Sequence, residues 1–456
     1  MVVNFEPGER VHVIGVGGAG MSGLARLLAE KGCIVSGSDV HESATLDELR
    51  AAGVLVHTGH DASNGSDARV VLWSPAVRAD NVELVAARRR GALLLRRGEA
   101  LAALAGAQRV IGLTGTHGKT TATSMLVHVM LCEGRDDSRL LGASVTGVGA
   151  NGHFGADDLL LEVDESFGTF SLLHPYALGV LNVEADHLDH YGSLENLEVA
   201  FAELIKRTSG PVVIWRDDEG ARRVSDLAKR VVVDVGTSEA STWRVSDVQL
   251  SRRNASFVLR GPGREIPVEL RVTGLHNVAN AAVVATLAAA LDVRSTSIER
   301  GLANFVGAPR RFQYLGSWRG VDVYEDYAHL PGEIAATIRA TSAAGYERIA
   351  VVFQPHRVTR TVNLASGFES AFEGASYVVV TDIYGAGEPN PTGVTGEILL
   401  AGIQRHSGAS LAVYAQGFDG VVDALASLHD RCDVVLFLGA GDIADAARAL
   451  PGGVDR

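Results

Sequence analysis

Twice in the first third of the chain, a short apolar run leads through a glycine-rich loop into a pattern with apolar residues on one helical face. The first stretch covers residues 11–28 and the second covers residues 109–130. A buried strand, a tight loop and an amphipathic helix in this order are typical of a βαβ unit. The repetition therefore predicts an α/β protein with mostly parallel sheets.

Apolar runs and helical patterns continue to alternate along the rest of the chain, and a third series of strand-like runs follows residue 309. A chain of 456 residues is too long for one core, and about 150 residues per domain suggests three domains. We therefore expect a Rossmann-like N-terminal domain at 1–105, a central P-loop ATPase-like domain with a mostly parallel sheet at 106–308, and a Rossmann-like C-terminal domain at 309–456.

Composition and charge narrow the range of functions. Hydrophobic residues make up 46% of the chain and charged residues 21%, which is the balance of a soluble globular protein. The net charge of −13 disfavours non-specific binding to nucleic acid, which needs clustered positive charge. No apolar run is long enough to span a bilayer, no signal peptide is evident, and the three cysteines lie far apart without disulfide or metal-site spacing. We expect a cytoplasmic protein that binds neither nucleic acid nor membrane.

The first glycine loop has the spacing of a dinucleotide-binding site. It fits the GxGxxG pattern between a strand and a helix, and Asp39 ends the next strand. Glycines let the backbone approach a pyrophosphate, whose charge the helix N-terminus stabilises. Alone, this pattern would indicate an NAD-dependent dehydrogenase, and a tight turn without a ligand is the structural alternative. The candidate binding residues in the loop are Gly15, Gly17, Gly18, Ala19 and Gly20.

The second glycine loop is the strongest signal in the chain. Backbone amides of such a loop surround phosphates, a lysine reaches the terminal phosphates, and the next hydroxyl binds Mg²⁺. Leu113 stands where the general pattern requires its first glycine. Lys119 is retained in a chain that otherwise prefers arginine, which supports a specific role for its compact ammonium group. The loop consists of Thr114, Gly115, Thr116, His117, Gly118, Lys119, Thr120 and Thr121.

Two predicted strands after this loop end in acidic residues. Residues 159–166 read LLLEVDES, and residues 184–189 read EADHLD after another apolar run. Strand ends in a parallel sheet face the ligand crevice, so these carboxylates can meet a cation held at the phosphate loop. A single acidic run is more often a solvated loop. Two such runs beside a phosphate loop favour metal or nucleotide binding.

Together, these motifs resemble those of the Mur ligases over nearly the whole chain. TGTHGKTT is that family's own phosphate loop, which accounts for the departure at Leu113. The resemblance implies an ATP-dependent ligase that uses Mg²⁺, with Lys119 on phosphate and with Thr120, Glu165 and His187 at the metal. The further ATP-binding residues that it implies are His276, Asn277 and Asn280 of the HNxxN motif, Arg311 of the RRF segment, and Asp326 at the ribose.

Other stretches resemble the alanine-adding branch of the family. GVGGAGMSGLA in the first loop implies binding of the UDP part of a sugar nucleotide, and FQPHRVTRT (353–361) implies contacts with the acceptor carboxylate and the amino acid. Phe201 stands where later-acting members place a carbamoylated lysine. The implied reaction joins L-alanine to the lactyl carboxylate of UDP-N-acetylmuramate, in a monomer or homodimer. Besides the glycine loop, the implied substrate-binding residues are Met21, Asp39, Ser74, His329, His356, Arg357 and Arg360, and the implied catalytic residues are Lys119, Glu165, His187 and Arg357.

Departures from the family pattern keep alternatives open. The segment DYxHHPTE reads DYAHLPGE here, with Leu330 and Gly332 at two changed positions, and Phe167 replaces an aspartate. These changes bear on amino-acid specificity. The alternatives are a sister ligase that attaches a recycled peptide or another amino acid to the same acceptor, and an inactive nucleotide-binding homologue. Retention of the lysine and metal residues argues against an inactive homologue.

The expected chemistry is activation of a carboxylate, which is a poor electrophile at neutral pH. We expect the carboxylate to attack the γ-phosphoryl group of ATP, giving an acyl phosphate that the amine then attacks. The residue that takes the amine proton is left open by the sequence, with His187, His329 and His356 as candidates.

Overall fold

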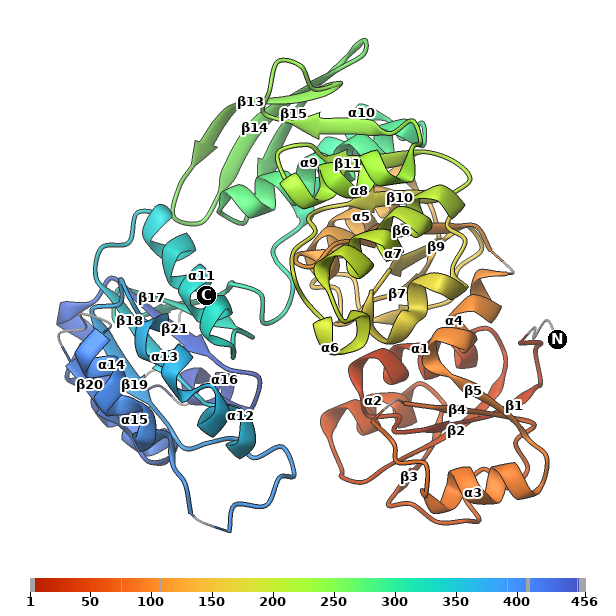
Figure 1. Cartoon of the computed structure of the whole chain (residues 1–456), viewed down its shortest axis with the longest axis horizontal. Helices are drawn as coiled ribbons and strands as arrows, with labels where there is room; N and C mark the ends of the chain where they lie inside the picture. The colour runs from red at the N-terminus through yellow and green to blue at the C-terminus, as the bar shows by residue number, and fades with distance from the viewer. Residues whose placement is uncertain are drawn as a thin grey trace. The chain divides into compact units, whose positions relative to one another are not determined.

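The computed structural model describes residues 5–74, 76–106, 108–391, 393–406, 411–448 and 450 (Figure 1). The chain divides into two compact units. The first unit comprises residues 1–249, 255–271 and 275–306, and the second comprises residues 250–254, 272–274 and 307–456. Each unit is built around parallel strands, as the alternating pattern predicts.

The N-terminal sheet is parallel throughout, with the strand order β3-β2-β1-β4-β5. Val11 and Val13 of β1 pack with α1, whereas Ile14 packs with α3. Helices α1 and α3 therefore cover opposite faces of the sheet (Figure 1). Burial of both faces explains why Val11, Val13 and Ile14 of this strand are apolar although they point to opposite faces. The elements are β1 (Arg10–Ile14), α1 (Ala19–Glu30), β2 (Ile34–Asp39), α2 (Ala44–Ala51), β3 (Leu55–Thr58), β4 (Val70–Trp73), α3 (Val82–Arg89), β5 (Leu93–Arg96) and α4 (Arg97–Ala105).

The central sheet has ten strands in the order β15-β14-β13-β12-β11-β10-β6-β9-β7-β8. Pairing is parallel from β13 through β7 and antiparallel between β14 and β15 and between β7 and β8. The strands are β6 (Val110–Thr114), β7 (Ser138–Leu140), β8 (Gly152–His153), β9 (Leu159–Glu162), β10 (Ala177–Val180), β11 (Val212–Trp215), β12 (Val233–Gly236), β13 (Trp243–Leu250), β14 (Ala255–Gly261) and β15 (Arg264–Leu270).

The alanine-rich stretch predicted after His276 forms α9, whose residues from Asn277 to Ala289 are buried on nearly all sides. A helix that is apolar all round belongs in the interior of a domain, and α9 packs against α5, α10 and the strands β10 and β11. The helices of this region are α5 (Lys119–Glu133), η1 (Ser166–Leu172), α6 (Leu188–Tyr191), α7 (Leu194–Arg207), α8 (Glu219–Ala228), α9 (Leu275–Ala290) and α10 (Ser295–Asn304).

Helix α1 also packs against β8, which joins the first two sheets in one unit. A Cβ atom on Gly152 would lie 1.9 Å from the carbonyl oxygen of Gly23, so this close contact requires glycine. The side-chain amide of Asn151 donates a hydrogen bond of 2.6 Å to the carbonyl of Ala19. The start of α1 is thereby fixed against the central sheet.

The C-terminal sheet has the order β16-β17-β21-β18-β19-β20, with β16 antiparallel and the other strands parallel. Helices α11 and α13 cover one face, whereas α15 and α16 cover the other. The elements are β16 (Gln313–Trp318), β17 (Val321–Asp326), α11 (Pro331–Ala343), β18 (Ile349–Phe353), α12 (Val358–Asn363), α13 (Ala365–Ala371), β19 (Tyr377–Val380), η2 (Gly396–Leu399), α14 (Leu400–His406), β20 (Leu411–Tyr414), α15 (Gly417–Ala426), η3 (His429–Arg431), β21 (Val434–Leu438) and α16 (Ala444–Arg448).

These sheets confirm the predicted α/β architecture with mostly parallel strands. The domain limits after residues 105 and 308 stay predictions. None of the described helices is long and apolar enough to cross a membrane.

Candidate active site

The second glycine loop connects β6 to α5, as the motif predicts. Gly115 and Gly118 have φ angles of 144° and 83°, which side chains of other residues rarely allow. Space is restricted as well: a Cβ atom on Gly115 would lie 2.9 Å from the carbonyl oxygen of Asn182, and one on Gly118 would lie 2.7 Å from Oδ1 of Asn280. Asn280 of the HNxxN motif is thus brought against the loop.

Asn182 forms hydrogen bonds to the phosphate loop, and it was not among the residues predicted from the sequence. Its Oδ1 accepts a hydrogen bond of 2.7 Å from the amide of His117, and its Nδ2 donates one of 3.0 Å to the carbonyl of His117. The amide of Thr116 donates to the Asn182 carbonyl. Asn182 lies two residues before the acidic run that begins at Glu184. Its position just beyond a buried strand is the only signal for it in the sequence.

Lys119 extends across the loop toward an acidic partner. Its Nζ donates to the carbonyls of Gly115 and Thr116 at 2.7 and 3.1 Å, and it lies 3.0 and 2.9 Å from the two carboxylate oxygens of Glu165. The Glu165 side chain is only 1% exposed. Burial raises the pKa of Glu165, although the nearby Lys119 opposes this shift. The ammonium group is therefore fixed at the loop.

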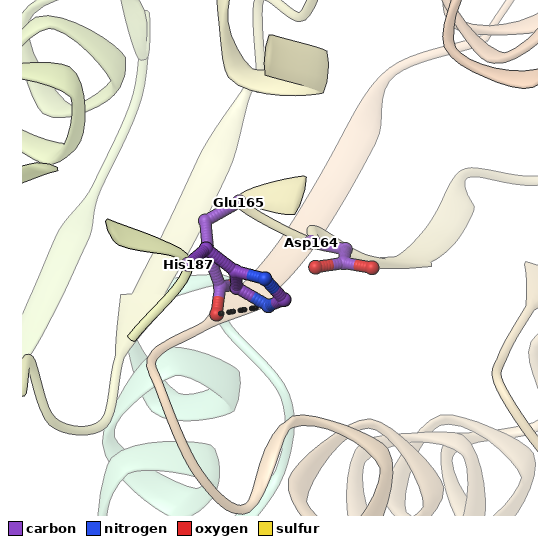
Figure 2. A group of neighbouring side chains, drawn as sticks. All are labelled: Asp164, Glu165 and His187. Atoms are coloured by element: carbon purple, nitrogen blue, oxygen red, sulfur yellow. Dashed lines mark ion pairs between the residues drawn. The ribbon is translucent and has the colours of Figure 1, made fainter. Parts of the chain in front are cut away.

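Asp164, Glu165 and His187 form a group in which one ligand atom from each residue lies within 4.8 Å of the others (Figure 2). Nε2 of His187 lies 3.8 Å from Oε1 of Glu165, the contact dashed in Figure 2. Two carboxylates beside a single ammonium group leave an excess of negative charge that a divalent cation can neutralise. This donor set fits a metal ion, and it brings together the predicted residues Glu165 and His187.

Thr120, predicted as a metal ligand, makes a hydrogen bond to a neighbouring carboxylate, and its role at the metal stays a prediction. Its hydroxyl donates a hydrogen bond of 2.9 Å to Oε1 of Glu162, and the amide of Gly142 donates to Oε2 of the same carboxylate at 2.7 Å. Thr120 and Glu162 thus lie together, while Asp164 is the third member of the metal-binding group. The sequence placed all these carboxylates at one strand end. It could not show which of them belong to the metal-binding group.

The remaining predicted ATP-binding residues lie in both units. On α9, Asn277 is buried and His276 is exposed. In the second unit, Asp326 accepts hydrogen bonds from the amides of Phe312 and Ala328 at 2.6 and 2.8 Å. Arg311 is exposed and lies over the Tyr327 ring, 5.5 Å from its centroid. Thr121 is partly exposed in the first turn of α5.

The FQPHRVTRT segment follows β18 and brings part of its predicted site together. Nη1 of Arg360 lies 3.2 Å from Nδ1 of His356, and the rings of His329 and His356 make an edge contact at 5.7 Å. Burial and the nearby cationic side chains lower the pKa of His356 to about 4. Arg357 has a positive φ of 69° and extends toward Glu388 at 3.8 Å. His329, His356 and Arg360 therefore form one cluster, with Arg357 at its edge.

The first glycine loop follows β1, and Gly15 has a φ of 77°. The amide of Gly17 donates a hydrogen bond of 2.8 Å to Oδ2 of Asp39, so this carboxylate supports the loop itself. A Cβ atom on Gly20 would lie 2.6 Å from the Arg97 guanidinium carbon. Nε of Arg97 is buried without a hydrogen-bond partner in the described part of the chain.

A cavity of about 720 Å³ opens beside this loop. Arg96 and Arg97, which sequence reasoning did not select, supply its positive charge; their signal was the RRGE segment at the end of a predicted strand. The lining residues are Gly18, Ala19, Gly20, Met21, Trp73, Ser74, Ala76, Arg96, Arg97, Gly98, Glu99, Gly168, Thr169, Ser171 and Leu172. The cavity lining thus includes three of the predicted loop residues, Gly18, Ala19 and Gly20, together with the predicted residues Met21 and Ser74.

The departures from the family pattern leave the local fold intact. Leu330 precedes α11, whose start is stabilised by Pro331 and by the Glu333 carboxylate accepting from backbone amides. Space is open around Gly332. Phe201 is fully buried on α7 and packs edge-on against Phe170. The Phe167 side chain lies outside the described residues.

Three family models match the chain. "Mur ligase family, catalytic domain" covers residues 10–109, "Mur ligase middle domain" covers residues 113–288, and "Mur ligase, glutamate ligase domain" covers residues 310–441. The matches follow one another in the order of the three sheets.

Relatives of known name match over nearly their full length. A UDP-N-acetylmuramate–L-alanine ligase of Thermobifida fusca is 40% identical over 450 residues, covering 96% of this chain and 94% of the relative. The enzyme of the same name from Rubrobacter xylanophilus is 40% identical, covering 97% and 99%. The crystal structure of a UDP-N-acetylmuramate-alanine ligase from Thermotoga maritima is similar with a TM-score of 0.82 at 29% identity, covering 96% of this chain and 97% of the other.

Proposed function

The chain belongs to the Mur ligase family, and we propose that it joins L-alanine to the lactyl carboxylate of UDP-N-acetylmuramate, with ATP converted to ADP and phosphate. The observation that carries this proposal is the phosphate loop, where Lys119 is fixed by Glu165 beside a cation-binding group. The names of relatives at 40% identity support the choice of substrates. The product would be a precursor of peptidoglycan.

The residues of the first unit are suited to phosphoryl transfer from ATP. The carboxylate of the acceptor attacks the γ-phosphoryl group, and negative charge spreads over its oxygens as the bond to ADP breaks. Lys119 stabilises this charge, while the loop amides hold the phosphates in place. Asp164, Glu165 and His187 would hold Mg²⁺, and Thr120, which donates a hydrogen bond to Glu162, would be a further ligand. Bound Mg²⁺ would supply further charge stabilisation.

The cavity beside the first glycine loop is suited to the acceptor. Its loop glycines allow close approach of a diphosphate, and the N-terminus of α1 favours negative charge. The buried Nε of Arg97 has no hydrogen-bond partner among the residues that the structure describes, and a phosphate oxygen would satisfy this donor. Arg96 lies beside it in the lining. These features suit a diphosphate, and the names of the relatives support a UDP-sugar over a nicotinamide cofactor in this cavity.

The cluster after β18 is suited to carboxylates. Arg360 contacts His356 through Nη1. A guanidinium group has further N–H donors and can bind a carboxylate through two parallel hydrogen bonds. We assign the carboxylate of the incoming amino acid to Arg360 and Arg357. The cytoplasmic location and the monomeric or homodimeric state expected from the sequence are part of the same proposal.

The test is phosphate release from ATP and Mg²⁺ in the presence of UDP-N-acetylmuramate. L-Alanine, glycine, L-serine and a recycled tripeptide are added separately. Release that depends on L-alanine is the expected result. Release only with the tripeptide or another amino acid would move the specificity to the sister ligase, and no release with any donor would favour an inactive nucleotide-binding homologue.

A further inference from the structure

Two histidines meet at one edge of the C-terminal sheet. His329 follows β17 and His356 follows β18, and both strands are parallel to β21, which lies between them. The carboxyl ends of parallel strands face the ligand crevice of an open α/β sheet. The two rings make an edge contact with centroids 5.7 Å apart. Their hydrogen bonds show that Nε2 is a hydrogen-bond donor in one imidazole and an acceptor in the other.

His356 presents a proton donor. Its Nδ1 lies 3.2 Å from Nη1 of Arg360, and because a guanidinium group has only donors, Nδ1 must accept this bond. The pKa of about 4 makes the ring neutral at pH 7, so its single proton resides on Nε2. The ring also stacks on Tyr384, with the two planes 13° apart. His356 is therefore held as a hydrogen-bond donor.

His329 presents a proton acceptor. Its Nδ1 lies 3.0 Å from the carbonyl oxygen of Tyr327, and because a carbonyl has only acceptor sites, Nδ1 carries the proton. Burial lowers the pKa of His329, so the ring is neutral at pH 7 and Nε2 has a free lone pair. No group among the described residues makes a hydrogen bond to this Nε2.

The Glu333 carboxylate lies close to the His329 ring. Its Oε2 lies 3.4 Å from Nδ1 and accepts hydrogen bonds from the amides of His329 and Leu330 at 2.9 and 3.0 Å. This carboxylate is therefore fixed at the start of α11, where it can stabilise an imidazolium. The charged or titratable groups that act on His329 are Glu333 on α11, Arg360 on α12, Arg311 before β16 and His356 after β18.

We propose that His329 is the base that removes a proton from the incoming amine and that Glu333 is its positioning residue. This inference rests on the proposed function. The amine nitrogen forms a bond to the acyl carbon, and the bond between that carbon and the phosphate oxygen breaks, with its electron pair leaving on phosphate. The ammonium group of the amino acid gives one proton to Nε2 of His329 before the amine attacks, and the second proton, lost from the nitrogen as the amide forms, leaves on phosphate. His356 donates a hydrogen bond from Nε2 to a substrate oxygen.

His187, the third histidine considered from the sequence, is suited to another task. Its Nε2 lies 3.8 Å from the Glu165 carboxylate within the metal-binding group of the first unit. A histidine that binds a cation through this nitrogen has no lone pair left there for a proton. The structure thus separates three histidines that the sequence treated alike.

The experiment measures the two chemical steps separately in the full-length protein with ATP, Mg²⁺ and UDP-N-acetylmuramate. Hydroxylamine reports formation of the acyl phosphate, because its nitrogen is unprotonated at neutral pH and attacks without a base. L-Alanine reports the complete reaction. For His329→Asn, we expect hydroxamate formation within about threefold of wild type and a loss of about 10²-fold or more in amide formation with L-alanine.

A matched control is His406→Asn. Nδ1 of His406 also faces a carbonyl, that of Gly402 at 3.2 Å, and a carboxylate, that of Glu369 at 3.0 Å, but its side chain is half exposed on α14. Both rates should stay within about twofold of wild type. Glu333→Gln removes the charge that raises the pKa of His329, so the acid limb of the rate profile with L-alanine should move to lower pH.

The outcomes separate this inference from the proposed function. No hydroxamate from the wild-type protein would contradict the ligase itself. Hydroxamate from wild type together with normal amide formation in His329→Asn would overturn the assignment of the base. Loss of both steps in a folded His329→Asn protein would overturn it as well, since the base acts only in the second step. If that variant does not fold, an unchanged pH profile in Glu333→Gln would contradict the proposal.

Discussion

Lys119 and Glu165 form a buried ion pair, with Nζ 3.0 and 2.9 Å from the two carboxylate oxygens. The exposed fractions of the two side chains are 13% and 1%. Burial of such a pair costs desolvation energy that its attraction offsets only with good geometry, so the pair is weak support for stability alone. Its position on the phosphate loop instead gives the lysine one fixed direction. Glu165 is also in the metal-binding group, so the lysine and the metal site are physically linked.

Gly118 and Gly134 provide a paired test of the loop, because they cap the two ends of α5 with φ angles of 83° and 84°. Alanine in this conformation costs roughly 1–2 kcal/mol at either position. A Cβ atom on Gly118 would also meet the Asn280 amide at 2.7 Å, whereas space is open around Gly134. We expect both Gly→Ala variants to lose stability in denaturant unfolding, but only Gly118→Ala to lose ATP affinity by titration. Equal ATP affinity in the two variants would contradict the loop assignment.

In the sequence Asp164 was one of several carboxylates at a strand end, and the structure places it in the metal-binding group. We expect Asp164→Asn to raise the Mg²⁺ concentration needed for half-maximal activity by about tenfold or more, with recovery in excess Mg²⁺. Asp186→Asn removes a charge at a similar place, since its carboxylate lies 4.0 Å from His187 but outside the group. That control should leave the Mg²⁺ requirement almost unchanged. The same requirement in both variants would remove Asp164 from the metal site.

The pKa of His356 predicts a pH effect on stability. The folded pKa is about 4, whereas the unfolded value is about 6.5. Between these values the unfolded chain binds more protons, so the free energy of unfolding decreases as the pH falls from 6.5 towards 4. The contribution of His356 to the free energy of unfolding is fully present above pH 6.5. Denaturant unfolding at several pH values should show a shallower decrease for His356→Asn than for wild type, and equal slopes would show that the His356 pKa is not depressed.

Much of the fold follows from local sequence patterns. The apolar run of β1 and the stripe on α1 require burial on both faces of a parallel sheet, and the structure has this arrangement. The alanine-rich α9 is buried because small side chains let it pack closely against α5 and the sheet. These features depend on periodicity and residue size within one segment, which a sequence displays directly.

The site was predictable only where one segment carries the whole signal. The phosphate loop shows itself through its glycines and Lys119. Asn182 and Arg97 contribute through contacts with residues far away in the sequence, and no local pattern reveals such contacts. The protonation of His329 depends on the Tyr327 carbonyl, that is, on the path of the backbone. Hydrogen bonds between distant segments therefore determine the protonation and role of side chains whose residue type alone does not settle them.

The central claim is that this chain couples ATP cleavage at Lys119 to amide formation, and product analysis tests it most directly. Wild-type protein with ATP, Mg²⁺, UDP-N-acetylmuramate and L-alanine should yield ADP, phosphate and the alanine amide of the acceptor in equal amounts, measured by phosphate assay and mass spectrometry. Lys119→Ala should reduce all three together by about 10²-fold or more. ATP cleavage without amide, or amide formation by Lys119→Ala at the wild-type rate, would contradict the account.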